Sequence, residues 1–153
     1  MKALGRHFIL ELSHCSSEVL CSLTKVREYI VEAAKRANAH VLKVTFHKFS
    51  PHGISGVVVI AESHLSIHTW PEEGYAAVDI YTCGDTTTPE TACEYLAQMF
   101  EAKNVKLTVV NRGVKNGNGS FSHVVSNSSQ LCLDSGQNLA EVPRRRHAVL
   151  RSA

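Results

Sequence analysis

The sequence predicts an α+β fold: a two-layer α/β sandwich in which two helices cover one face of a mainly antiparallel sheet. Short apolar runs with the alternation typical of half-buried strands recur along the chain. Two longer stretches place apolar residues every three or four positions, which indicates amphipathic helices. Short turns join several of the strands, and such hairpin connections favour antiparallel pairing. Two amphipathic helices need one sheet face to cover, which gives the two layers.

Each expected element is visible as a local pattern. The expected strands span residues 7–12, 41–49, 54–62, 75–82 and 105–110. A turn at Ser50-Pro51-His52-Gly53 joins the second strand to the third. The first helix is expected over about residues 18–38, with a clear 3.6-residue period. A second helix opens at residues 87–90, where Thr87 is expected to act as the cap, and its apolar face ends at Phe100.

Composition points to one small domain with reduced thiols. The 153 residues are 44% hydrophobic and 20% charged, and the formal net charge of +2 is too small to indicate nucleic acid as a partner. No apolar run approaches the roughly 20 residues that cross a bilayer, and the N-terminus lacks a signal-peptide core, so we expect no membrane partner and a cytoplasmic protein. Five cysteines at irregular spacings do not form a disulfide pattern.

The C-terminal quarter differs from the rest. Residues 114–153 begin with the linker-like run Lys115-Asn116-Gly117-Asn118-Gly119-Ser120 and contain a short basic cluster, Arg144-Arg145-Arg146. Small polar residues and few apolar ones favour disorder. The sequence therefore predicts one folded domain over residues 1–113, followed by a disordered extension over residues 114–153.

The segment with most chemical information lies at the end of the third expected strand. After the apolar run Val57-Val58-Val59-Ile60, the chain reads Ala61-Glu62-Ser63-His64-Leu65-Ser66-Ile67-His68-Thr69-Trp70-Pro71-Glu72. The Ser63 hydroxyl can attack the Glu62 carbonyl and convert the amide to an ester. Removal of the Ser63 α proton then expels the ester, which severs the chain. Dehydroalanine remains and is converted by water to a pyruvoyl group, an electron sink made from the protein itself, with no metal or pyridoxal phosphate.

His68 is the best candidate for the base, because imidazole titrates near neutral pH. In a strand, residues an even number apart share a face, whereas Ser63 and His68 are an odd number apart. The two side chains therefore need a bend between them or a meeting across a symmetric interface.

Five stretches of the chain resemble the S-adenosylmethionine decarboxylase proenzymes of bacteria and archaea. The resemblance spans roughly residues 3–113 and is carried by Leu4-Gly5-Arg6-His7, Phe46–Gly56, Glu62–Glu72, Gly74–Asp79 and Thr82-Cys83-Gly84. Long, ordered motifs of this kind are far more specific than a three-residue pattern.

The resemblance implies a role for each candidate residue. It implies cleavage between Glu62 and Ser63 into a chain of residues 1–62 and a chain of residues 63–153. Ser63 becomes the pyruvoyl group that forms a Schiff base with the substrate, and His68 accepts a proton in processing. Cys83 donates the proton that replaces the departing carboxylate.

The remaining implied residues concern processing, substrate and assembly. Ser55 assists processing and Glu72 holds the substrate ribose. From the residues themselves, Phe46 and Phe49 lie on opposite strand faces, so only one of them can easily stack on an adenine, and we take Phe49 as the candidate. The resemblance also implies a homodimer with two interfacial sites, in which Ser63 and Cys83 come from one protomer and Ser55, His68 and Glu72 from the other. The product would be the aminopropyl donor for spermidine synthesis.

Other interpretations stay open from the residues alone. The same chemistry would serve a decarboxylase of arginine or ornithine. A module without enzymatic activity is a further alternative: an unprocessed regulatory partner, or a zinc protein using His64 and His68, completed by Glu72 and Cys83. Trp70 is expected in the core rather than at the substrate. On the face left free by the helices, we expect alternating residues of 57–60 and 76–80 to bury themselves against a second copy.

Overall fold

The computed structural model of the chain describes residues 2–134 and 136–142. Its eight strands form one sheet with the order β2-β3-β4-β5-β1-β6-β7-β8, and every neighbouring pair is antiparallel. The strands are β1 (Gly5–Ser13), β2 (His40–Lys48), β3 (Ile54–Ala61), β4 (Ser63–Trp70), β5 (Tyr75–Cys83), β6 (Asn104–Lys115), β7 (Phe121–Leu133) and β8 (Leu139–Glu141). The helices are α1 (Ser17–Cys21), α2 (Leu23–Arg36), α3 (Pro89–Met99) and the short 3-10 helix η1 (Pro71–Glu73).

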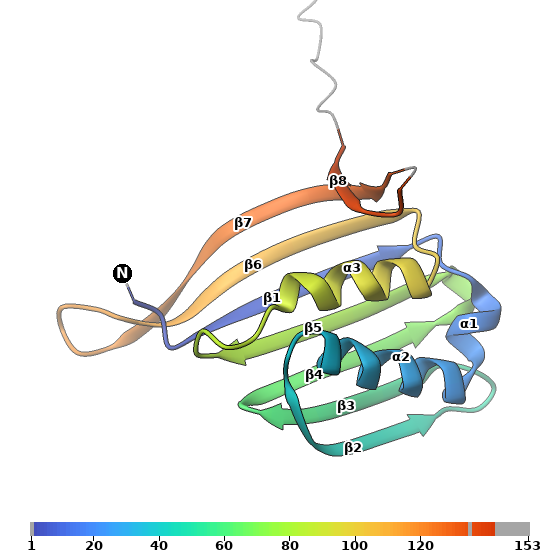
Figure 1. Ribbon diagram of the computed structural model, residues 1–153, viewed down its shortest axis with the longest axis horizontal. Helices are drawn as coiled ribbons and strands as arrows, with labels where there is room; N and C mark the ends of the chain where they lie inside the picture. The colour runs from blue at the N-terminus through green and yellow to red at the C-terminus, as the bar shows by residue number, and fades with distance from the viewer. Residues whose placement is uncertain (1, 135, 143–153) are drawn as a thin grey trace, which may run out of the picture.

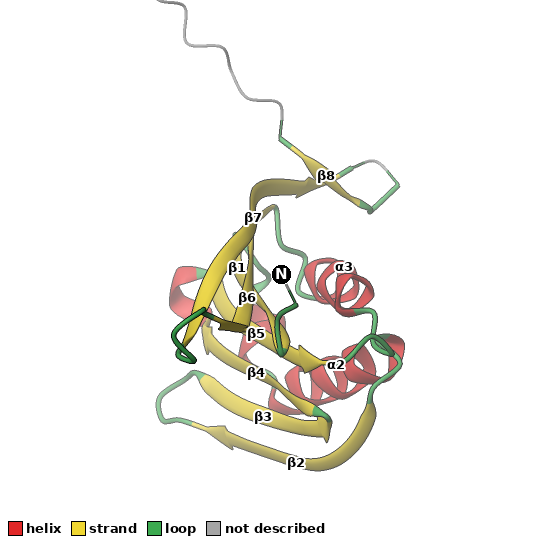
Figure 2. Cartoon of the chain, turned by 90° about the vertical axis from the view of Figure 1, so that its left-hand side faces the viewer, coloured by secondary structure: helices red, strands yellow, loops and turns green. Residues whose placement is uncertain are grey.

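Helices α2 and α3 lie on the same face of the sheet, as Figure 1 shows, and Figure 2 shows the two layers from the side. The predicted α+β two-layer sandwich is therefore confirmed. The core lies between the layers: alternate residues of β1, β3, β4 and β5 point toward the helices and are buried. The largest fully buried side chains are Phe8, Leu10, Leu12, Leu20, Ile30, Ile54, Ile60, Leu65, Ile67, Ile80, Leu96 and Phe100. None of the described helices is long and apolar enough to span a membrane.

The helix predictions need two corrections. The single helix expected over residues 18–38 is two helices, because Ser22 has an extended backbone that ends α1, and its side chain accepts a hydrogen bond from the Lys25 amide at the start of α2. Thr87 does not cap α3. Thr88 occupies the cap position without a side-chain hydrogen bond, and the Thr87 hydroxyl is buried with no hydrogen-bond partner among the described residues.

The prediction of a disordered extension is wrong for most of its described part. β6 continues to Lys115 and pairs with β7 along its length. β8 pairs in turn with the end of β7. Main-chain hydrogen bonds hold β7 to β6, while its side chains are mostly exposed and only Leu131 is buried. Because this strand contributes so little to the core, its sequence lacks the alternating apolar residues by which a strand is predicted. The basic cluster at residues 144–146 lies outside the described residues.

Candidate functional site

The first group of candidate residues gathers where β3 begins and β4 ends. Ser55 and His68 are directly opposite each other on these strands, and Ser55 Oγ is 2.8 Å from His68 Nδ1. Glu72 follows on η1, where its carboxylate is 3.0 Å from His52 Nε2. These residues line a pocket of about 350 Å³ with Phe49, Pro51, His52, Gly53, Ile54, Thr69 and Trp70.

Buried Thr69 holds this corner of the fold in place. Its hydroxyl accepts a hydrogen bond from the Ile54 amide and donates one to the Leu20 carbonyl, so it ties the start of β3 to α1. The neighbouring residues His68 and Trp70 consequently face the side of the sheet without helices. The expectation that Trp70 lies in the core is wrong: its side chain is 41% exposed and stacks on Tyr75, with 5.2 Å between ring centroids.

The two aromatic residues considered for the adenine have separate surroundings. Phe46 packs over Gly56 and contacts the core, whereas Phe49 is half exposed and lines the pocket beside His68 and Glu72. An exposed ring at the edge of a pocket is available for stacking, and a ring packed on the core is not.

The second group lies at the opposite end of β4. Ile60 pairs with Ser63, so the chain reverses within two residues, and the Glu62–Ser63 bond lies in this tight hairpin. Ser63 has a backbone φ of 130°, a region that side-chain-bearing residues seldom adopt and that stores strain. Ser63 pairs with Thr82 on β5, which places Cys83 one residue from the partner of Ser63. The Ser63 and Cys83 side chains are both half-buried.

The two groups do not meet within one chain. β4 is a continuous strand without a bend from Ser63 to His68, and at about 3.3 Å per residue these residues are about 16 Å apart. Regular alternation would also put them on opposite faces, but Ser63, with a φ of 130°, departs from strand geometry, so its face is not set by alternation. Of the two arrangements that the sequence allowed, a bend is therefore excluded.

The structure also separates the residues considered for zinc. His64 and His68 lie on the same face of β4 but about 13 Å apart along it. His64 is beside Tyr81, whereas His68 is bonded to Ser55 and Glu72 to His52. Within residues 2–134 and 136–142, no three histidine, cysteine or carboxylate side chains are close enough to hold a metal ion.

Sequence reasoning missed the polar network on the helix-free face of the sheet. Asp79 accepts hydrogen bonds from His7 (2.9 Å) and Ser66 (3.2 Å), and the Tyr75 hydroxyl donates one to Glu11. Burial is the main cause that raises the pKa of Tyr75 to about 12, and the Glu11 carboxylate adds to it. Alternation along residues 75–83 was the available signal, because every polar or ionisable side chain there except Thr82 falls on the odd positions.

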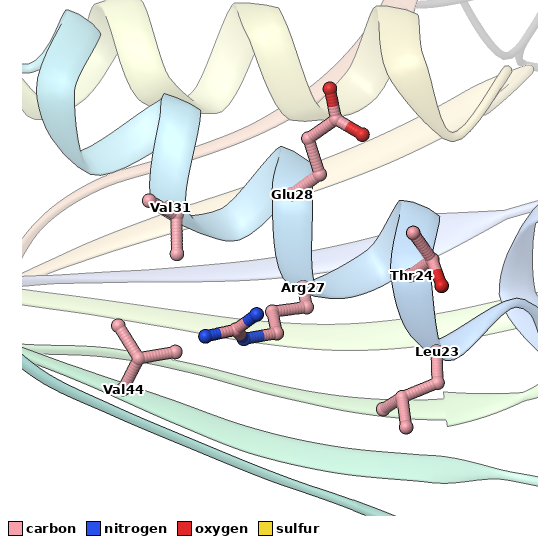
Figure 3. Close-up of a pocket in the computed structure, with 6 residues that line it drawn as sticks. All are labelled: Leu23, Thr24, Arg27, Glu28, Val31 and Val44. Atoms are coloured by element: carbon pink, nitrogen blue, oxygen red, sulfur yellow. The ribbon is translucent and has the colours of Figure 1, made fainter.

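A further pocket lies away from both groups of candidate residues. It has a volume of about 460 Å³ and is formed between α2 and β2 (Figure 3). The side chain of Arg27 extends from the helix toward Val44 on the strand. None of the candidate residues lines this pocket, whose walls are Leu23, Thr24, Arg27, Glu28, Val31 and Val44.

Comparison with known proteins places this arrangement in a family. The family model described as S-adenosylmethionine decarboxylase matches residues 6–113. An S-adenosylmethionine decarboxylase proenzyme of Moorella thermoacetica is 56% identical over 114 residues, which cover 74% of this chain and 91% of that protein. One from Pyrococcus horikoshii is 45% identical over 125 residues, covering 82% and 90%.

Solved structures agree with the fold. The crystal structure of the adenosylmethionine decarboxylase from Aquifex aeolicus superposes with a TM-score of 0.71 at 37% identity, covering 76% of this chain and 97% of that one. A Trypanosoma brucei AdoMetDC monomer, at 14% identity and a TM-score of 0.54, shares the fold.

Proposed function

The chain belongs to the S-adenosylmethionine decarboxylase family, and we propose that it is a self-processing enzyme that converts S-adenosylmethionine to decarboxylated S-adenosylmethionine and carbon dioxide. The observation that carries the proposal is the placement of Ser63 in a strained two-residue hairpin, with Cys83 next to its register partner Thr82. The product would supply aminopropyl groups for spermidine synthesis. A cytoplasmic location, which remains a prediction, would keep the Cys83 thiol reduced.

Self-cleavage begins with Ser63. Its Oγ attacks the Glu62 carbonyl, the C–N bond breaks, and an ester forms while the nitrogen becomes a free amine. His68 of a second copy then removes the Ser63 α proton, and the ester C–O bond breaks. Residues 1–62 leave with a carboxylate at Glu62, and residue 63 is left as dehydroalanine. Water replaces its nitrogen, ammonia departs, and the pyruvoyl group is complete. The φ of 130° at Ser63 supports this course, because cleavage releases the backbone strain at that residue.

The residues around position 63 fit a pyruvoyl group. Its precursor serine is half-buried at a strand end, and Cys83 follows the register partner of that serine on the neighbouring strand. The group supplies a sink for the electrons released when the substrate loses its carboxylate. Cys83 delivers the proton that takes the place of that carboxylate on the substrate carbon.

The pocket at the other end of β4, supplied by the second copy, binds the rest of the substrate. The Glu72 carboxylate accepts hydrogen bonds from the ribose hydroxyls, and the Phe49 ring stacks on the adenine. A volume of about 350 Å³ is within the range of small-molecule sites. These contacts favour a nucleoside-bearing substrate over arginine or ornithine, and the similarity to S-adenosylmethionine decarboxylase proenzymes supports the same choice.

A two-fold homodimer completes the site. The face of the sheet without helices exposes Val57 and Val59, and a partner sheet packed there would remove them from water. Antiparallel packing of two such faces brings the Ser63 end of one β4 to the His68 end of the other. That arrangement explains how residues about 16 Å apart in one chain act on the same bond.

Intact-mass analysis of the purified protein tests the proposal. We expect two chains, residues 1–62 and a second chain that starts with a blocked pyruvoyl group at position 63. Ser63→Ala should stay as one chain. Ser66→Ala is the matched control, because it removes a serine hydroxyl from the same strand and should still cleave. A wild-type chain that stays intact after prolonged incubation refutes the proposed self-processing activity.

Release of carbon dioxide by the cleaved protein then identifies the substrate. We expect release from S-adenosylmethionine and none above background from arginine or ornithine at equal concentration. Release from arginine or ornithine alone would replace the substrate assignment and keep the pyruvoyl chemistry.

A further inference from the structure

Tyr81 lies across the strand end that carries Cys83. Cys83 on β5, Gly5 on β1 and Arg112 on β6 form one row across three neighbouring strands. Tyr81 precedes Cys83 by two residues and shares its face of the sheet. A Cβ on Gly5 would lie 2.7 Å from the Tyr81 hydroxyl oxygen and 2.8 Å from its ring carbons. The phenol therefore rests directly on the Gly5 backbone, in space that only a glycine leaves free.

The Tyr81 ring is held on several sides. Its register partners on the two neighbouring strands are His7 and His64, with ring centroids 5.7 and 6.0 Å away. The guanidinium carbon of Arg112 lies 5.1 Å from the ring centroid, within the range of a cation–π contact. A ring bounded by two imidazoles, a guanidinium and a backbone has little freedom to move.

The Tyr81 hydroxyl lies at the strand end that carries the Cys83 thiol, because it lies against Gly5, the register partner of Cys83. Burial is the main cause that raises the pKa of Tyr81, interaction and hydrogen bonding with Cys83 raise it further, and Arg112 acts in the opposite direction. At neutral pH the phenol accordingly keeps its proton and can donate it in a hydrogen bond to sulfur.

We propose that Tyr81 is a positioning residue for Cys83: its phenol, fixed over Gly5 by His7, His64 and Arg112, aims the thiol at the substrate carbon. This inference rests on the proposed function, in which Cys83 is the proton donor. Neither the Tyr81 hydroxyl nor Gly5 takes part in the transfer itself.

Aim matters here because two carbons compete for the proton. Protonation of the substrate carbon gives the decarboxylated product and leaves the pyruvoyl group intact. Protonation of the carbon of residue 63 instead leaves the substrate nitrogen on that residue. Water then releases the substrate as an aldehyde, and position 63 becomes alanine. A thiol that is free to turn delivers more protons to the wrong carbon.

The test is the number of turnovers per alanine formed at position 63 in Tyr81→Phe. N-terminal sequencing and intact mass detect the chain that starts with alanine, because alanine has a free amino group and the pyruvoyl group does not. Carbon dioxide release counts the turnovers. We expect normal self-cleavage and about 10- to 100-fold more alanine per turnover than in the wild type. Tyr95→Phe is the control: it removes the hydroxyl of a helix α3 tyrosine that also lies under an arginine, Arg36, at 4.3 Å. Its number of turnovers per alanine formed should equal that of the wild type.

A second variant tests the support under the ring. Gly5→Ala displaces the phenol without altering its chemistry, and alanine formation should rise as in Tyr81→Phe. Active Tyr81→Phe and Gly5→Ala enzymes with the wild-type number of turnovers per alanine formed overturn the inference. Loss of self-cleavage in Tyr81→Phe alone also overturns it, because Tyr81 would then serve processing. An uncleaved wild type refutes the proposed function and this inference with it, whereas an active wild type with unchanged variants refutes the inference alone.

Discussion

Mixing two inactive variants tests whether each site is shared between two chains. Ser63→Ala removes the nucleophile and His68→Ala removes the base, so each protein alone should stay uncleaved or nearly so. In a mixed dimer, one site combines the intact Ser63 of the His68→Ala chain with the intact His68 of its partner. The other site lacks both groups. Only the His68→Ala chain should therefore be cut.

The expected yield follows from the geometry and from random pairing. About 16 Å along β4 separates Ser63 from His68 in one chain, roughly five times the reach of a hydrogen bond, so a site within one chain contributes nothing. Random pairing of equal amounts puts about half of the His68→Ala chains in mixed dimers, and a tenfold excess of Ser63→Ala raises this to about nine-tenths.

Mass spectrometry of the mixture under conditions of subunit exchange gives the cleaved fraction directly. The control partner is the double variant Ser63→Ala/His68→Ala, which forms the same mixed dimers but supplies no base. No cleavage above this control, with exchange demonstrated by differently labelled subunits, refutes the shared site. A monomer in sedimentation experiments would refute the assembly itself.

Three further predictions test other parts of the structure. Cys83→Ala should cleave itself normally but lose decarboxylase activity by about 100-fold or more, because the thiol acts only in turnover; an uncleaved variant would assign it to processing instead. Burial raises the pKa of Cys15 to about 12 and also raises that of Cys93, so at pH 8 both thiolates are scarce. Iodoacetamide should modify them last in the folded protein, and equal labelling of all cysteines contradicts their burial. A Cβ on Gly56 would lie 2.1 Å from the Phe46 ring, so Gly56→Ala should lower the free energy of unfolding by about 1–3 kcal/mol in urea denaturation. An unchanged free energy of unfolding would contradict the tight packing of that ring on Gly56.

The fold could be predicted because its core elements have clear periodicities. The buried residues of α2, for example Val26 and Ile30, follow a helical period, and those of β5, Val78 and Ile80, alternate. β4 was not predicted as a strand because its outward positions carry His64, Ser66 and His68, whose polar character obscured the buried alternation of Leu65 and Ile67. The polar side chains proposed for function therefore hid the strand pattern of β4.

β7 was missed for a different reason. Its strand is specified by pairing with β6, and eight successive residues from Phe121 to Ser128 are exposed. Hydrogen bonds between main chains are available to any sequence without proline, so composition could not separate this strand from a linker. The candidate site shows the same limit. Individual residues could be named from motifs, but the contact of Ser55 with His68 depends on a register that only the folded sheet defines.

That register also fixes which nitrogen of His68 can act as the base. Ser55 Oγ is bonded to Nδ1, so the proton taken from Ser63 must go to Nε2. A neutral imidazole accepts at Nε2 only if Nδ1 carries the hydrogen, and Nδ1–H then donates to Ser55 Oγ. In the proposed enzyme Ser55 is thus the acceptor that selects the tautomer, and His68 presents its free nitrogen to the uncovered face of the sheet. A base about 16 Å from its own Ser63 is useful only to the serine of another chain, so the local hydrogen bond and the two-fold assembly support the same mechanism.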